Sequence, residues 1–402
     1  MAPLKLNTVG ILPAGALGVG FFYHLTQQLT QLDGDVFFIA RRESRSSEML
    51  RQAGSIRIAP LPSGRASERP EDESDKLIQT VPTAKLLKPD LLQADEFLPE
   101  IVLACPNPDQ ILPLITTTVE LLVQLYESDR LDVDPLPMPM LVLASNGIYF
   151  QRFRQILIEK LEEATLFGRL PDLWPELMPR IISRFLRGVT IQTGLREGNG
   201  ADTLYRPGPR GITRIAGGDR PCRQRCSQVL TERGGWFEAI EDRSATRLEF
   251  DKALLNLAAN LLGQLYAIDE SGQFNLLTIG EISAPDHHAD MMALAHHVFQ
   301  VGLRVRAYSA KESFKEICDR LFQTSAAHAS HVPSSLQWVD LNLRRGTLKP
   351  EMTPTESWLL EPLLRYARAS DLPESVAFFE GLKQQLLDKL SKASGRSLTP
   401  TG

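Results

Sequence analysis

The chain has 402 residues, more than the roughly 250 to 300 at which one hydrophobic core stops growing, so two domains are expected. Hydrophobic residues make up 43% of the sequence and charged residues 23%, which excludes a disordered or fibrous protein. The net charge of -5 leaves no basic surplus for a phosphate backbone, so no nucleic-acid partner is expected.

Cysteine and histidine usage argues against disulfides and metals. The four cysteines are too scattered for a disulfide framework or a zinc site. The histidine run at residues 287–297 fits no zinc pattern and predicts a polar helix surface, so no metal is expected.

The N-terminus lacks the features of an export signal, and no apolar run approaches the roughly 20 residues that span a bilayer. We therefore predict a cytoplasmic protein with no membrane partner.

The N-terminal part predicts alternating strands and helices. Residues 7–12 form a short buried strand, followed by a turn rich in glycine and alanine and by an apolar helix, and a second strand covers 35–40. Residues 61–76 are polar and mixed in charge, which indicates an exposed insertion without a core. The apolar runs 100–104 and 138–144 end in loop-like sequences and suit buried parallel strands.

The pattern changes toward the C-terminus. Residues 188–241 alternate short strands with turns, which predicts the far edge of the sheet. After Asp242, long amphipathic patterns predict an all-α domain. These patterns cover residues 248–266, 289–306, 310–322, 355–369 and 373–393. The predicted fold class is thus an α/β N-terminal domain over 1–243 followed by an all-α C-terminal domain over 244–402.

The turn after the first strand is typical of a dinucleotide-binding fingerprint, in which the backbone approaches a pyrophosphate at a helix N-terminus. Gly15 permits this approach, and Gly18 lets the helix meet the strand. Pro13 replaces the first glycine and removes an N–H, so the turn differs in detail. The predicted cofactor contacts are Pro13, Ala14, Gly15, Ala16, Leu17 and Gly18. The alternative is a tight strand-to-helix turn without a ligand.

The end of the second strand indicates which dinucleotide is bound. Arg41 and Arg42 stand where an NAD enzyme carries Asp or Glu on the ribose 2′-hydroxyl. A guanidinium binds a 2′-phosphate through paired hydrogen bonds, and Ser44 and Arg45 could add donors, so NADPH is the predicted cofactor. A solvated basic turn is the alternative interpretation.

A polar stripe marks the helix predicted over 248–266. Lys252, Asn256 and Asn260 follow one another at spacings of four, so one cation and two carboxamides share a helix face. The residues between them are apolar, which favours a chemical site over a polar face that is partly exposed to water.

Several segments, in their order and approximate spacing, resemble the ketopantoate reductase family. They are PAGALG, FFIARRES, SNG at 145–147, RGVTIQTG, KALLNLAAN, SSLQWVD and TPTESWLLEPLLRYA. The resemblance implies a Rossmann-type domain joined to a helical domain like the C-terminal domain of 6-phosphogluconate dehydrogenase.

The same resemblance assigns roles to the polar residues. Lys252 would be the general acid, because an ammonium stabilises the alkoxide that forms as the ketone accepts hydride and also supplies the proton. Glu356 would bind the hydroxyl or carbonyl end of the substrate. Its alternative is a helix-start carboxylate stabilised by the helix dipole, with Thr355 as the cap.

Four further residues are implied to bind ligands. Asn146 would lie near the nicotinamide and the substrate, whereas Asn256, Asn260 and Ser335 would hold hydroxyl and carboxylate groups of the substrate. Asn146 precedes a glycine and could instead serve a favoured turn. Ser335, or its neighbour Ser334, could instead cap a helix.

The chain departs from the family in two places that bear on the site. Pro106 or Asn107 stands where the family usually has a lysine, so one contact is lost. The stretch between Ser335 and Glu356 contains an additional RRGTLKPEM, so the relative geometry of these two residues could differ from the family's.

The leading hypothesis is NADPH-dependent reduction of a 2-oxo acid to a 2-hydroxy acid, either 2-dehydropantoate to pantoate, as in pantothenate biosynthesis, or a related substrate. One alternative is an opine-type or other 2-hydroxy acid dehydrogenase that relies on His296 or His331. Another is a non-catalytic NADPH-binding sensor, favoured by Pro13 and the missing lysine. The expected partner is a small 2-oxo acid, and a homodimer is a possible assembly.

Overall fold

Two compact units divide the chain in the computed structural model, which describes residues 2–40, 45–59, 78–88, 90–91, 96–198 and 202–396. The first unit comprises Met1–Ser145 and Phe150–Ala245, and the second comprises Asn146–Tyr149 and Thr246–Gly402. The predicted insertion at 61–76 and both Arg41 and Arg42 lie outside the described residues. Within the described ranges, no helix combines the length and the apolar character that a bilayer crossing requires.

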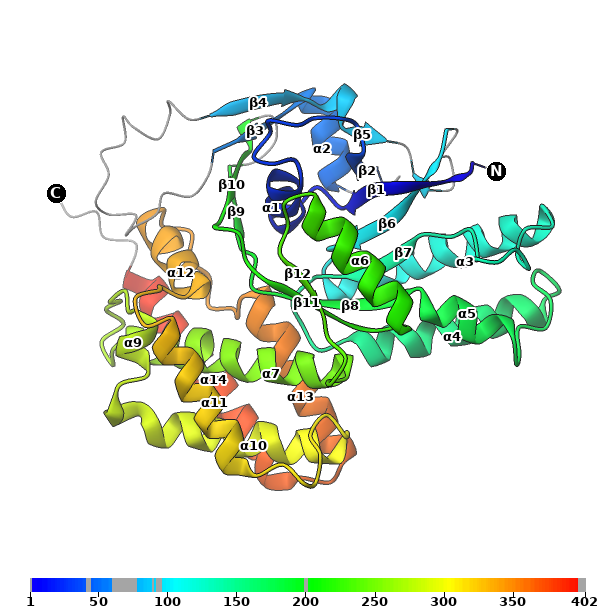
Figure 1. Cartoon of the computed structure of the whole chain (residues 1–402). Helices are drawn as coiled ribbons and strands as arrows, with labels where there is room; N and C mark the ends of the chain where they lie inside the picture. Colours follow the sequence, from blue (N-terminus) through cyan, green and yellow to red (C-terminus); the bar gives the residue numbers. More distant parts are fainter. Residues whose placement is uncertain are drawn as a thin grey trace. The chain divides into compact units, whose positions relative to one another are not determined.

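An eight-stranded sheet lies at the centre of the first unit, with the strand order β12-β11-β8-β7-β6-β1-β2-β5 (Figure 1). Its strands in chain order are β1 (Leu4–Leu12), β2 (Val36–Ile39), β5 (Leu87–Lys88), β6 (Leu98–Ala104), β7 (Met140–Leu143), β8 (Phe185–Thr190), β11 (Thr213–Gly217) and β12 (Phe237–Ala239). The six strands β8, β7, β6, β1, β2 and β5, in this spatial order, all run parallel to their neighbours. Next to them, β11 is antiparallel to β8 and parallel to β12. The runs predicted at 7–12, 35–40, 100–104 and 138–144 overlap β1, β2, β6 and β7.

These central strands are apolar because both faces of the sheet are covered. Every residue of β6 is buried, and so are the last five residues of β1. A parallel strand covered on both faces has no solvent side, which explains the continuous apolar runs in place of an alternating pattern. Two phenylalanines, Phe22 from the first helix and Phe38 from β2, pack with their ring centroids 4.7 Å apart in this core.

In the part of this unit that the structure describes, six α-helices flank the sheets. They are α1 (Ala16–Leu25), α2 (Arg45–Ala53), α3 (Ile111–Glu127), α4 (Phe150–Leu166), α5 (Leu177–Ser183) and α6 (Arg220–Glu232). In α4 the buried residues Phe150, Phe153, Leu157 and Leu161 recur at spacings of three and four, which places them on one face of the helix.

The segment predicted as the far edge of the sheet divides between two sheets. Strands β8, β11 and β12 do lie at that edge. However, β9 (Gly194–Glu197) and β10 (Leu204–Pro207) join β3 (Ser55–Ile58) and β4 (Gln79–Pro82) in a second sheet of order β4-β3-β10-β9. Pairing between β10 and β3 spans a long sequence separation, which local patterning does not reveal.

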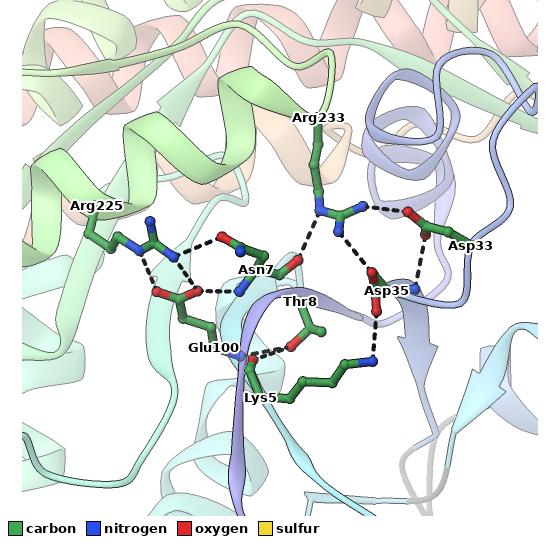
Figure 2. A network of polar contacts seen from close by, with 8 residues as sticks. All are labelled: Lys5, Asn7, Thr8, Asp33, Asp35, Glu100, Arg225 and Arg233. Carbon is green, nitrogen blue, oxygen red and sulfur yellow. Dashed lines mark hydrogen bonds and ion pairs between the residues drawn. The ribbon is translucent and has the colours of Figure 1, made fainter.

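A network of hydrogen bonds and ion pairs connects the N-terminal half of β1 to β6 and to α6 (Figure 2). Glu100 is buried and accepts the Asn7 backbone N–H at 2.5 Å and the Arg225 Nε at 2.6 Å. Arg233 donates to the Asn7 carbonyl at 3.0 Å and pairs with Asp33 and Asp35. Asn7 has a left-handed backbone where the pairing of β1 with β6 shifts register, so these side chains satisfy an irregular strand.

The second unit is helical in its described part, apart from an isolated bridge between Ile268 and Phe274 (Figure 1). Its α-helices are α7 (Ala245–Asn256), α8 (Gly263–Ala267), α9 (Ile279–Ile282), α10 (His288–Arg304), α11 (Phe314–Ala327), α12 (Ser334–Arg344), α13 (Pro354–Ala369) and α14 (Pro373–Arg396). An apolar core that includes Phe250, Leu294 and Phe379 links most of these helices, and a smaller cluster of Ala267, Ile282 and Leu336 packs α9 against α8 and α12. The predicted order of an α/β domain followed by an all-α domain is confirmed.

The helix predicted over 248–266 is not uniform. α7 ends at Asn256, a π-helical turn (η8) covers Leu257–Leu262, and α8 follows. A π turn is wider than an α turn, so it rotates the residues that follow it relative to α7. The prediction that Lys252, Asn256 and Asn260 lie along one regular α-helical face is therefore wrong in detail, because Asn260 lies inside the π turn.

Candidate functional site

The glycine turn lies at the switch point of the eight-stranded sheet. β1 pairs with β2 on one side and with β6 on the other, and Leu12 at the end of β1 is in register with Ala104 at the end of β6. Open α/β sheets bind ligands at the carboxyl ends of such strands. The turn after β1 and the loop after β6, which begins at Cys105, are therefore at the edge of the sheet where a ligand is expected.

The N-terminus of α1 is suited to an anion. Gly15 is its N-cap, no side chain caps the helix, and the first turn contains no acidic residue. A Cβ on Gly15 would meet no atom within 4 Å, so there is space next to the backbone N–H groups of the first turn. Such unpartnered donors, together with the helix dipole, attract phosphate groups.

Gly18 has a different function in the same turn. A Cβ at this position would lie 2.2 Å from the Pro13 carbonyl oxygen, so only glycine lets α1 pack against the turn. The Leu12–Pro13 peptide bond is cis, and the Ala14 carbonyl accepts the Tyr205 hydroxyl at 3.1 Å. The turn thus has a proline in place of the first glycine of the usual fingerprint, but it keeps a glycine at the open position 15 and another at the close contact of position 18.

The predicted loop asparagine, Asn146, belongs to the helical unit. It precedes Gly147, whose φ of 124° requires a glycine at this turn. Two backbone N–H groups that follow are bound by this unit: Ile148 donates to the Trp358 carbonyl at 3.2 Å, and Tyr149 donates to Glu249 Oε1 at 3.1 Å.

Lys252 and Asn256 are partly buried, one turn apart, near the end of α7. His331, in the segment before α12, lies near Lys252. Partial desolvation lowers the pKa of His331, and the charges of His328 and Lys252 lower it further, which favours the neutral imidazole. His296, the other histidine considered for an opine-type reaction, is exposed and contacts Phe314 edge-on.

Asn260, Ser335 and Glu356 form a buried hydrogen-bonded chain in the helical unit. Asn260 Oδ1 accepts the Ser335 backbone N–H at 3.2 Å, and the Ser335 hydroxyl donates to Glu356 Oε1. All three side chains are buried, and Glu356 is only 1% exposed. Burial raises the pKa of Glu356 to about 7, although the Ser335 hydrogen bond opposes this rise. Its second oxygen, Oε2, is buried without a partner.

These hydrogen bonds and the helix caps around them revise three expectations. Ser335 does not cap α12, whose N-cap is Pro333, because its hydroxyl is bonded to Glu356. Thr353 rather than Thr355 is the N-cap of α13, and it makes no side-chain cap bond. The long stretch between α12 and α13 does not separate Ser335 from Glu356, which remain in direct contact.

Two more buried polar side chains were missed by the sequence reasoning. Gln264 is fully buried, donates to the Asn260 carbonyl at 3.1 Å and leaves its Oε1 without a partner. The Thr353 hydroxyl is likewise buried and unpaired. Gln264 continues the spacing of four from Asn256 and Asn260, so the sequence did contain a signal for it. Buried polar groups usually have a hydrogen-bond partner, which an ordered water or a polar ligand can supply to these two side chains.

The histidine run takes part in aromatic packing. His287 stacks on Tyr266 at 3.8 Å, and His297 stacks on Phe378 at 4.2 Å. Among the described residues, no group of three or more His, Cys, Asp or Glu side chains is placed to hold a metal ion.

A hollow of about 520 Å³ lies at the other end of α1, away from the glycine turn. Its lining includes Tyr23, His24, Pro207 and Arg210. His24 Nε2 lies 3.0 Å from the Gly208 carbonyl oxygen, and burial lowers the pKa of this histidine. None of the predicted site residues lines this hollow, so the chemistry described above does not involve it.

Solved structures of known proteins share the fold of this chain. No family profile matches the sequence, and no curated protein matches it. A D-mandelate dehydrogenase solved with NADH and anilino(oxo)acetate has a similar structure, with a TM-score of 0.60, 13% identity and coverage of 96% of this chain and 99% of that one. A dimeric ketopantoate reductase from Staphylococcus aureus has a TM-score of 0.55 and 13% identity, with coverage of 95% of this chain and 99% of that one. A 2-dehydropantoate 2-reductase from Geobacter metallireducens has a TM-score of 0.53 and 15% identity, with coverage of 94% of this chain and 99% of that one. The resemblance to ketopantoate reductases is thus confirmed for the fold.

Proposed function

We propose that this chain is an NADPH-dependent oxidoreductase that reduces a 2-oxo acid to a 2-hydroxy acid. The buried chain of Asn260, Ser335 and Glu356 is the observation that carries the proposal, because its free carboxyl oxygen lacks a hydrogen-bond partner. The structural relatives include enzymes named for such substrates, ketopantoate reductases and a D-mandelate dehydrogenase. Within this class, 2-dehydropantoate is the first substrate to test.

The glycine turn would hold the pyrophosphate of the dinucleotide. The space beside Gly15 and the uncapped N-terminus of α1 fit an anionic group. Arg41 and Arg42 would bind the 2′-phosphate and select NADPH over NADH. When bound, the reduced nicotinamide supplies the hydride for the reaction.

The helical unit would bind and activate the substrate. Lys252 would hold a proton at the carbonyl oxygen, where its ammonium stabilises the developing negative charge and then donates that proton. Glu356 Oε2 would bind a hydroxyl or carbonyl end of the substrate, and Asn146, Asn256, Asn260 and Ser335 would orient the remaining groups. A carboxyl group with a pKa near 7 can donate a hydrogen bond when protonated and accept one when ionised.

The direct test follows the absorbance of reduced nicotinamide with 2-dehydropantoate and a panel of 2-oxo acids, using NADPH and NADH in parallel. Lys252→Ala is expected to lower kcat by at least about 100-fold, because a general acid contributes about that much, while the Kd for NADPH stays near the parent value. Equal turnover in the parent and in Lys252→Ala contradicts the assigned role of Lys252.

An opine-type reaction is the second candidate, and the position of His331 near Lys252 is the observation that favours it. His331→Gln, with His296→Gln as the control, separates the two. The lysine mechanism predicts substantial activity in both histidine variants, whereas loss of turnover in His331→Gln alone favours the opine-type reaction. NADPH binding without turnover of any 2-oxo acid would favour the non-catalytic sensor.

A further inference from the structure

The four residues Asn146–Tyr149 pack with the helical unit, although the chain on both sides of them belongs to the α/β unit. Ile148 is 3% exposed and is part of the apolar core that contains Phe250 and Leu254 of α7. This segment carries Asn146, so the surroundings of Asn146 are set by helices of the second unit.

Trp358 provides the first attachment of this segment. Its carbonyl would normally accept the backbone N–H four residues later, but that residue is Pro362, which has no N–H. The Ile148 N–H occupies this carbonyl instead, at 3.2 Å. The proline inside α13 thus leaves an acceptor for the loop, two residues beyond Glu356.

Glu249 provides the second attachment. Its Oε1 accepts the Tyr149 N–H at 3.1 Å, and the side chain is only 2% exposed. A buried carboxylate is costly unless it accepts hydrogen bonds, so a glutamate at this position of α7 needs a polar function. Glu249 precedes Lys252 by three residues, which places both side chains on neighbouring turns of the same helix face.

We propose that Glu249 is a positioning residue of the reaction: by binding the Tyr149 N–H, it fixes the backbone of residues 146–149 and thereby orients Asn146 relative to Lys252. This inference rests on the proposed function. Glu249 itself need not touch substrate or cofactor, because it acts through the loop. Misplacement of a ligand-orienting group by about 1 Å can lower a rate on the order of 100-fold.

Glu249→Met removes the acceptor at similar size, and Glu249→Gln keeps an amide oxygen that can accept the same N–H. We expect kcat/KM for the 2-oxo acid to fall on the order of 10- to 100-fold in the Met variant and to be largely rescued in the Gln variant. Hydrogen exchange of the Ile148 and Tyr149 amides is expected to be slow in the parent and in Glu249→Gln, and faster in Glu249→Met.

Glu100→Met is the matched control, because Glu100 is also a buried carboxylate that accepts a backbone N–H, but it lies in the α/β unit at the opposite end of β6 from the switch point. It should lower the free energy of unfolding without changing kcat/KM per folded molecule or amide exchange at 146–149. A similar loss of kcat/KM in both Met variants would show a general effect of lost stability and would overturn the positioning role.

Three other outcomes are decisive. Parent-like exchange and kcat/KM in Glu249→Met overturn the inference while the proposed function stands. If Glu249→Met does not fold, fast exchange of the two amides in the parent or in Glu249→Gln overturns it. If the parent turns over no 2-oxo acid, the proposed function fails and the positioning role fails with it, whereas the exchange data still show whether Glu249 holds the loop.

Discussion

The Ser335 hydroxyl donates its hydrogen to Glu356 Oε1 inside the helical unit, and the second carboxyl oxygen of Glu356 has no partner. The two residues come from the first turns of α12 and α13. A glutamate that is 1% exposed would usually be protonated or paired with a cation, and its pKa of about 7 reflects this burial. The pair therefore predicts a measurable dependence of stability on pH, and its unpaired oxygen is where we propose that the substrate binds.

Glu356→Gln should remove a pH-dependent loss of stability. The pKa of Glu356 is raised from 4.5 to about 7 in the folded state, so the folded protein binds a proton more tightly than the unfolded chain. Its stabilising contribution is therefore complete below pH 4.5 and is lost as the pH rises through 7. We expect the variant to gain about 3 kcal/mol in free energy of unfolding relative to the parent between these limits.

Urea unfolding at a series of pH values measures this difference, with the exposed Glu351→Gln as the control. The control should follow the parent at every pH. A Glu356→Gln curve parallel to the parent from pH 4 to 8 would show that the Glu356 carboxyl has an ordinary pKa.

Ser335→Ala should move the same transition to higher pH. The Ser335 hydrogen bond stabilises the ionised carboxylate and lowers its pKa, so removing the hydroxyl raises the pKa of Glu356 further above 7. The lost bond should also cost about 1 kcal/mol of stability. Ser334→Ala is the matched control, because Ser334 is adjacent but exposed. An unchanged midpoint of the pH-dependent stability in Ser335→Ala would contradict the hydrogen bond between the two side chains.

The two glycines of the turn after β1 should respond differently to alanine. Gly15→Ala places a Cβ in open space, at a φ of −88° that alanine adopts, so the fold should persist while affinity for NADPH falls. Gly18→Ala forces a Cβ to 2.2 Å from a backbone oxygen, so it should lower the melting temperature. Thermal unfolding and NADPH titration of both variants test this. Parent-like affinity in Gly15→Ala would mean that the pyrophosphate does not lie against this glycine.

Arg225→Met should destabilise the α/β unit. It leaves the buried Glu100 carboxylate without its guanidinium partner, which we expect to cost about 3 kcal/mol in free energy of unfolding. Arg220, on the same helix, is 70% exposed, and its Nε lies 3.8 Å from Glu241 Oε1, which is too long for a hydrogen bond. Arg220→Met should therefore change the free energy of unfolding by less than about 0.5 kcal/mol. Equal effects of the two substitutions in chemical denaturation would show that the network in Figure 2 contributes little.

Local sequence patterns were sufficient to predict the central strands, the helical second domain and the residue types of the candidate site. Buried parallel strands need continuous apolar runs, so β1, β2, β6 and β7 were visible locally. The glycine pattern of the turn was visible too: Gly18 lets α1 pack against the turn, whereas Gly15 leaves open space at the start of the helix. The spacing of Lys252, Asn256 and Asn260 indicated a polar feature within an apolar helix.

Which of these groups come into contact depends on long-range packing and could not be predicted from local patterns. The contact between Ser335 and Glu356 joins residues 21 positions apart, and the bond from Tyr149 to Glu249 joins residues 100 apart. Burial that raises the pKa of Glu356 depends on packing from several helices, and the π turn around Asn260 has no distinct local pattern. Local propensity acts over a few residues, whereas these contacts depend on how distant segments of the chain pack together.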